Sequence, residues 1–257
     1  MFRWLTERRR KHLIEAPFPE AWTAILERNV GAYELLDADE QHRLRELVQV
    51  FVAEKHWEGC GGLELTDEMR VTIAGAGCLM ILAREHDLFD DVDSILVYPS
   101  TVVAPPEQRG FFDSRMTPLR TETALLGEAH YKGPVILAWD DVRQGAANPH
   151  DARNVVIHEL AHKIDFLDGT IDGTPPLETR AERRAWGEAF SAAFLAQKAR
   201  AEHGQTSFLR DYAITNEAEY FAVVSEAFFE KPKQLAQALP DVYAALRDFY
   251  RLDLAAR

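Results

Sequence analysis

The chain has 257 residues, of which 47% are hydrophobic and 28% are charged, so it can bury a sizeable core under an ordinary soluble surface. The formal net charge of −13 argues against non-specific binding to nucleic acid, whose phosphates carry the same sign. Cys60 and Cys78 are too few for a disulfide framework and lack the spacing of a Cys-based zinc site, so we expect buried free thiols.

The N-terminal segment, residues 1–12, is basic. No apolar segment follows it as in a secretory signal, and no apolar stretch approaches the ~20 residues of a membrane span. We therefore expect a cytoplasmic protein without a membrane span. The basic run is expected to be the solvated end of a helix, and contact with an acidic partner or a membrane surface is the alternative.

Helical patterns dominate the next part of the chain. Residues 19–29 are expected to form a helix. A second helix is expected to start at residues 37–40, because apolar residues recur at helical spacing from Leu44 to Val52. A third is expected to start at residues 66–68. We interpret these apolar stripes as core packing.

Strand signals follow at residues 94–98 and 133–139, which are short, apolar and rich in β-formers. Residues 99–132 contain many turn formers and are expected to form loops and short strands. Residues 140–150 are expected to be a loop that ends the second strand. That strand could be a sheet edge along which a peptide binds, or an ordinary core strand.

The remainder of the chain is nearly all helical. We expect helices at residues 151–166, 178–201 and 216–230, and one or two more before the C-terminus, with Gly169 and the 173–176 segment as breaks. The predicted fold is one α+β domain spanning residues 1–257. It has a mainly helical part (1–90), a strand and loop part (91–150) and a helical part (151–257), with room for a site near residue 150.

The motif that points to chemistry is His158-Glu159-Leu160-Ala161-His162. Residues four apart share one face of a helix, so both imidazoles can bind one metal ion. Glu159 lies beside the metal and can accept a proton from a water molecule there. The helix is apolar on most sides, and burying these polar groups without a partner would cost several kcal/mol. The alternative is a set of hydrogen-bonded core residues.

Catalytic zinc usually has three protein ligands and an open position for water. A third histidine six residues after His162 would be typical of a metzincin, but position 168 is Asp. The third ligand is therefore expected to be a glutamate of the 212–229 segment. Glu217 fits a first helical turn without any metal. Glu219 begins a buried face, and Glu226 lies two turns further on the same side, so Glu219 ranks first and Glu226 second.

The motif, Tyr212 and the segment Asn216-Glu217-Ala218-Glu219-Tyr220-Phe221-Ala222 together resemble the Mlc titration factor A family of bacterial zinc peptidases. They are also similar to the catalytic domain of the lethal factor type of toxin protease. The resemblance is strongest over residues 151–230. It implies a zincin-like metallopeptidase fold of the α+β class, with a small mixed sheet, the H-E-x-x-H helix and a helical C-terminal half.

The resemblance also implies roles for particular residues. It places the ligands of one Zn²⁺ at His158, His162 and Glu219, the general base at Glu159 and a catalytic tyrosine at Tyr212. A phenol beside the metal could donate a hydrogen bond to the oxyanion, or could occupy the open metal position at rest. Without the resemblance, Tyr212 would be interpreted as an ordinary packed tyrosine.

A metal-binding histidine normally donates its second N–H to a carboxylate or carbonyl. Asp165, three residues after His162 on the same helix, is the nearest candidate partner. Asp168 is the second candidate partner. Asn154 either holds an imidazole in a similar way or caps the helix.

Two functions are compatible with the sequence. One is a gluzincin peptidase, with aminopeptidase activity implied by the resemblance. The other is a regulatory protein that sequesters a transcriptional repressor such as Mlc, for which hydrolysis is secondary. We expect a monomer. The sequence indicates neither the side-chain preference nor whether peptides are cut internally or from the N-terminus.

Overall fold

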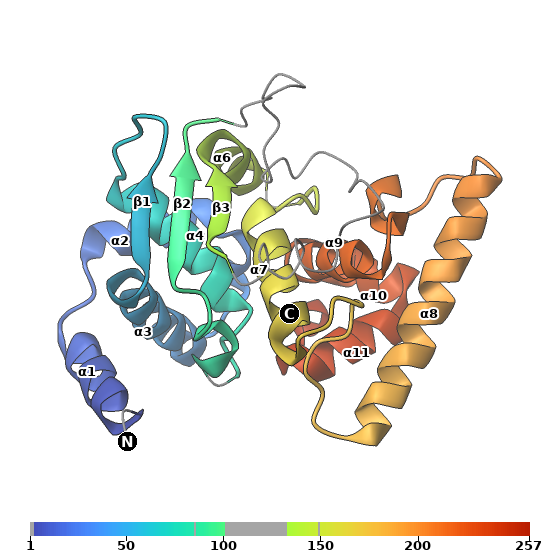
Figure 1. Cartoon of the computed structure of the whole chain (residues 1–257), viewed down its shortest axis with the longest axis horizontal. Coiled ribbons are helices and arrows are strands. Elements are labelled where there is room, and N and C mark those ends of the chain that lie inside the picture. Colours follow the sequence, from blue (N-terminus) through green and yellow to red (C-terminus); the bar gives the residue numbers. More distant parts are fainter. Residues whose placement is uncertain (1–2, 85, 101–132, 149) are drawn as a thin grey trace.

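The computed structural model describes residues 3–84, 86–100, 133–148 and 150–257. Figure 1 shows a small sheet flanked by helices on one side of the molecule and a helical half on the other. No helix in this described part is long and apolar enough to cross a membrane. The helices and strands, in chain order, are α1 (Arg3–Glu15), α2 (Glu20–Asn29), α3 (Ala38–Glu54), β1 (His56–Gly59), α4 (Asp67–Leu79), β2 (Ser94–Tyr98), β3 (Val135–Ala138), α6 (Trp139–Ala147), α7 (Val155–Asp165), α8 (Arg180–Glu202), α9 (Glu217–Glu230), α10 (Pro232–Ala238) and α11 (Pro240–Tyr250).

The predicted helix starts in the N-terminal part are confirmed. Asp37 caps α3 in a reciprocal capping box with Glu40, and the Thr66 side chain caps α4. The basic run lies on α1, where Arg10 forms a two-pronged contact with Glu54 of α3. Arg9 beside it is exposed, as expected for a solvated helix.

The sheet has the order β1-β2-β3, and both strand pairs are parallel. The two predicted strands are confirmed as β2 and β3, whose inward side chains, such as Ile95 and Leu137, are almost fully buried. The prediction of a mixed sheet is not met by the described strands, which all run parallel. Strand β1 was not predicted, because His56–Gly59 is short and has no apolar alternation.

One further prediction was wrong. Residues 140–147 were expected to be a loop, but Trp139–Ala147 forms helix α6 directly after β3. Two aspartates in its first turn, Asp140 and Asp141, favour a helix start because they complement the positive end of the helix dipole. The loop prediction gave too much weight to the turn-forming residues after Gly145.

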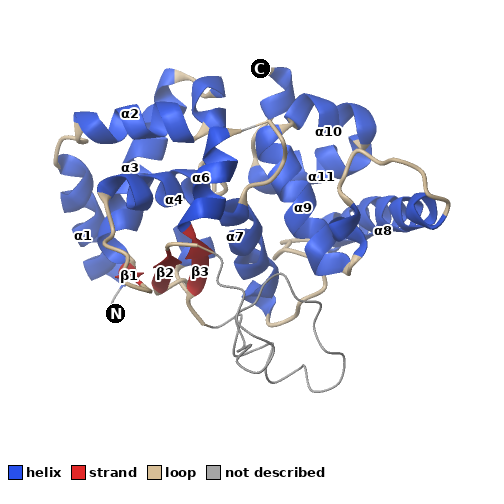
Figure 2. Ribbon diagram, turned by 90° about the horizontal axis from the view of Figure 1, so that it is seen from above, coloured by secondary structure: helices blue, strands red, loops and turns tan. Residues whose placement is uncertain are grey.

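In the C-terminal half, α7 packs along α9 on one side and against α4 on the other. Figure 2 shows α7 between the sheet and the helices α8, α9, α10 and α11. The contact with α4 is close: a Cβ atom added at Gly77 would lie 2.6 Å from Leu160 Cδ1. Helix α9 is buried along almost its whole length, and every residue from Tyr220 to Glu230 is buried.

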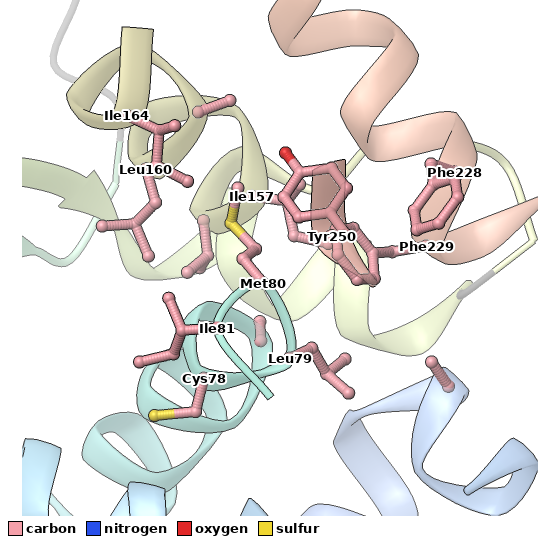
Figure 3. Close-up of a cluster of buried hydrophobic side chains, with 14 of the residues drawn as sticks. Cys78, Leu79, Met80, Ile81, Ile157, Leu160, Ile164, Phe228, Phe229 and Tyr250 are labelled. Carbon is pink, nitrogen blue, oxygen red and sulfur yellow. The ribbon is translucent and has the colours of Figure 1, made fainter. Parts of the chain in front are cut away.

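A single hydrophobic cluster extends from Ile25 to Leu254 and so includes residues from both halves of the chain. Figure 3 shows its centre, where side chains of α4, α7, α9 and α11 meet. Cys78 lies there, fully buried, and burial raises the pKa of its thiol. Cys60 is half-buried, and both cysteines are free thiols, as predicted. The division into a single domain stays a prediction.

Candidate metal centre

Helix α7 presents both histidines of the motif on one face. The Asn154 side chain caps the helix by accepting a hydrogen bond from the Ile157 N–H at 3.2 Å. His158 and His162 follow one and two turns later, are 8% and 7% exposed, and lie with their Nε2 atoms 3.3 Å apart. The two imidazoles therefore point toward one place, as residues four apart on a helix can do.

Helix α9 brings a carboxylate to the same place. Asn216 caps α9 by accepting a hydrogen bond from the N–H of Glu219 at 2.9 Å, which places Glu219 in the first turn. The Glu219 Oε2 atom lies 3.1 Å from His158 Nε2 and 3.6 Å from His162 Nε2. The first choice of third ligand from the sequence therefore lies beside both histidines.

The three atoms fit a metal ion. Tetrahedral coordination with bonds of about 2.0–2.1 Å places ligand atoms about 3.3–3.4 Å from one another. The distances are 3.3 Å between His158 and His162, 3.1 Å between His158 and Glu219 and 3.6 Å between His162 and Glu219. They lie on both sides of the tetrahedral value. Two imidazoles and one carboxylate are also the donor set that a catalytic zinc site uses. In the described part of the chain, these three residues form the one group that could hold a metal ion.

Electrostatic attraction holds this group together. Burial alone would lower the pKa of His158, but hydrogen bonds with Glu219 and Glu226 outweigh burial and raise the pKa to about 10. Burial raises the pKa of Glu219, while His158 and His162 lower it, and the net pKa is well below the usual range. Both shifts reflect the close approach of the imidazoles and the carboxylate in this group.

Glu226, the second choice of third ligand from the sequence, lies behind His158. Its carboxylate is 1% exposed and accepts a hydrogen bond from Nδ1 of His158 at 2.8 Å, on the far side of the ring from Glu219. It also accepts from the Asn154 N–H at 2.7 Å and from Arg210 at 2.6 Å. The sequence predicts Glu226 as the alternative third ligand, because it lies two turns after Glu219 on the same side of the helix. Glu226 instead fixes the orientation of His158 from behind.

The other predicted partners of the imidazoles form hydrogen bonds with other groups as well. Asp165 is fully buried and accepts hydrogen bonds from the N–H groups of Gly173 and Thr174, and its charge lies near His162. Asp168 accepts from Thr170 in the following loop. Asn154 is the cap of α7, which was one of its two predicted roles.

Tyr212 and Glu159 flank the metal-binding group. Tyr212 lies on a short 3-10 helix, Asp211–Ile214, with its ring centre 6.0 Å from that of His158 and 40% of its surface exposed. Burial and the negative charges of Glu219 and Glu159 raise the pKa of its phenol, so Tyr212 stays protonated near neutral pH. Glu159 is half-buried, one residue after the first imidazole.

Strand β3 contacts helix α7, which carries His158 and His162. Within the described residues, β3 pairs with β2 on one side only. Lys163 of α7 donates a hydrogen bond to the Gly133 carbonyl, just before β3, at 2.7 Å. The use of this strand to bind a peptide stays a prediction.

Comparison with known proteins decides the family. The model of a family described as glucose-regulated metallo-peptidase M90 matches residues 4–251. The chain belongs to this family. The match covers nearly the whole M90 chain, including the helical N-terminal part, where the sequence alone offered no sharp motif.

Individual relatives agree with the family assignment. The M90 chain is 34% identical to Mlc titration factor A of Edwardsiella ictaluri, over 92% of this chain and 87% of the relative. It is 32% identical to Mlc titration factor A of Serratia proteamaculans, over 86% of this chain and 84% of the relative. An uncharacterized protein of Synechocystis sp. is 31% identical over 97% of this chain and 90% of the relative. The resemblance found from the motifs is thus confirmed over almost the full length.

Proposed function

We propose that the chain is a zinc-dependent peptidase with His158, His162 and Glu219 as metal ligands. The convergence of these three side chains, at distances that fit tetrahedral zinc, carries the proposal. Membership of a metallo-peptidase family supports it. Bound there, zinc would polarise the scissile carbonyl and lower the pKa of the attacking water toward ~7.

The residues beside the ligands supply the proton transfers. Glu159 lies one residue after His158 and acts as the general base that takes the proton from water and passes it to the leaving amine. Tyr212, whose raised pKa keeps its phenol protonated, donates a hydrogen bond to the oxyanion that forms on the carbonyl. Aminopeptidase specificity is part of the proposal, and cleavage inside a peptide is the alternative.

The substitution Glu159→Gln tests the enzyme function. The variant keeps all three proposed ligands, so we expect about one equivalent of zinc, measured by elemental analysis. It lacks a base, so hydrolysis of peptide–dye substrates should fall ~10²–10⁴-fold. Wild-type protein that holds zinc and cleaves no peptide in a broad panel would exclude the enzyme function. The same panel, with free and blocked N-termini, separates aminopeptidase from endopeptidase activity.

A second function is the binding of a transcriptional repressor such as Mlc. It is supported by the name of several relatives, Mlc titration factor A. Glu159→Gln separates the two functions, because a binding function should survive in a variant that cannot hydrolyse peptides. Titration of purified Mlc with wild type and variant measures this directly. A monomeric state and a cytoplasmic location remain predictions from the sequence.

A further inference from the structure

We propose that Arg210 is a positioning residue that fixes His158 and Tyr212 together. This inference rests on the proposed peptidase function, in which both residues act on the same substrate carbonyl. Arg210 lies two residues before Tyr212 and belongs to neither of the two sequence motifs. Its guanidinium contacts three groups of the site.

The first group that Arg210 holds is the carboxylate behind His158. Its Nη2 donates to Glu226 Oε1 at 2.6 Å and its Nη1 to Glu226 Oε2 at 3.2 Å. Glu226 Oε1 is also the atom that binds His158 Nδ1. Glu226 is 1% exposed, and a buried carboxylate needs hydrogen-bonding partners that offset its loss of water and hold it in one rotamer. Arg210 thereby fixes the acceptor that orients the imidazole.

The second group is the backbone that leads into α7. Arg210 Nη1 also donates to the carbonyl of Ala152 at 2.9 Å. Ala152 has φ of +59°, a left-handed conformation that is unfavourable for a non-glycine residue and needs support from its surroundings. Two residues later the Asn154 N–H donates to Glu226 Oε2, so one guanidinium and one carboxylate together hold the start of the metal-binding helix.

The third group is Tyr212 itself. The guanidinium carbon of Arg210 lies 5.8 Å from the centre of the Tyr212 ring, within the range of a cation–π contact. Arg210 is also the residue from which the 3-10 helix Asp211–Ile214 begins. An arginine anchored at three acceptor atoms therefore fixes both the start of this segment and one side of the phenol ring.

The decisive variant is Arg210→Lys, because it keeps the counter-charge of Glu226 but one ammonium cannot reproduce the planar fork. We expect zinc to dissociate ~10-fold or more readily, as is usual for changes to groups that hold a metal-binding histidine. With Co²⁺ in place of zinc, the visible absorption spectrum should shift, because the imidazole rotates. In steady-state kinetics with a peptide substrate, kcat should decrease by a larger factor than KM increases.

A double-mutant cycle tests the link to Tyr212. If Arg210 acts through the phenol, Tyr212→Phe should reduce kcat much less in the Arg210→Lys background than in wild type. Should Arg210→Lys fold poorly, Arg210→Met combined with Glu226→Gln removes both buried charges and gives a second background for the same cycle.

Arg10→Met is the matched control. Arg10 makes the same two-pronged contact with a carboxylate, Glu54, on helices remote from the site, and its side chain is 21% exposed against 27% for Arg210. The Arg10→Met variant should leave the zinc affinity, the Co²⁺ spectrum and kcat unchanged.

Three results would overturn the inference. The first is an unchanged Co²⁺ spectrum and zinc affinity in Arg210→Lys. The second is full additivity with Tyr212→Phe, since Arg210 would then serve His158 alone. The third is an equal effect of Arg10→Met, which would indicate general destabilisation.

If the wild type hydrolyses no peptide, the proposed function fails separately from this inference. The Co²⁺ spectrum then still tests the link to His158. The fluorine NMR line of a fluorotyrosine at position 212 tests the link to the phenol, and it should broaden in Arg210→Lys.

Discussion

The proposed metal ligands come from two helices. Substitutions should distinguish the residues that bind the metal from the residues that hold those ligands in place. Glu219→Ala removes a proposed ligand, so stoichiometric zinc should be lost. Glu226→Gln leaves all ligands in place but weakens the hold on His158, so zinc should remain with ~10–100-fold lower affinity. Competition with a chromophoric chelator measures both constants.

Asp168→Asn is the control for this pair. Asp168 was a candidate partner of the imidazoles from the sequence, but it accepts its hydrogen bonds from Thr170. This variant should bind zinc as the wild type does. Retention of stoichiometric zinc in Glu219→Ala, with loss in Glu226→Gln, would reverse the assignment of the third ligand.

Glu230 gives the stability a pH dependence. Burial raises the pKa of Glu230, and the charges of Glu226 and Asp151 raise it further. Hydrogen bonds from Asn154 and the Arg153 N–H lower it, and the net pKa is about 7. Between the unfolded value near 4.5 and about 7, the folded chain binds more protons. The free energy of unfolding should therefore fall as the pH rises through this window, by at most roughly 3 kcal/mol from this group.

Urea unfolding between pH 5 and 8 measures this dependence. Glu230→Gln cannot titrate and should lose less stability than the wild type across the window. Glu217→Gln, which changes an exposed carboxylate on the same helix, should follow the wild-type curve. A wild-type slope retained in Glu230→Gln would assign the dependence to other groups.

Among the helices and strands, the sequence predicted those features that depend on residues close together in the chain. The starts of α3, α4 and α9 were visible because Asp37, Thr66 and Asn216 are side-chain caps. The convergence of His158 and His162 was visible because helical spacing fixes which side chains share a face. Strand β1 was not visible, because its four residues form a strand through pairing with β2 and not through their own pattern.

Long-range contacts explain the rest of what was missed. Arg210 meets Glu226 and Ala152 across 16 and 58 positions of sequence, and no local pattern marks such pairs. Glu226 was visible as a buried-face glutamate, but the sequence cannot tell whether a carboxylate touches the metal or the back of an imidazole. Only the relative placement of α7 and α9 decides that question.

The contact between α4 and α7 offers a test at this scale. Gly77→Ala adds a Cβ that would lie 2.6 Å from Leu160 Cδ1 in the core, so we expect a loss of about 1–3 kcal/mol of stability. Gly187→Ala on α8 places the same methyl group in open space and should stabilise by about 0.5–1 kcal/mol. Urea unfolding of both variants measures the difference. Equal effects would mean that α7 is not closely packed on α4.

At the scale of the whole molecule, zinc binding and folding should be linked. A ligand that binds only the folded chain at ~100 times its dissociation constant adds about 2.7 kcal/mol to the stability. For a chain of this size, that corresponds to about 5–10 °C in the melting temperature. Thermal unfolding with and without a chelator measures the shift, and Glu219→Ala should show none. An equal shift in Glu219→Ala would place the stabilising metal elsewhere.

The burial of α9 determines how destabilising substitutions should affect the activity of this protein. Because every residue from Tyr220 to Glu230 is enclosed, this helix has no solvent-exposed turn there that could fray alone. Within this enclosed range α9 carries Glu226 and Glu230, so these two carboxylates should leave their places only when the fold as a whole opens. Substitutions far away in the core should then reduce the number of working molecules while leaving each remaining molecule's turnover intact.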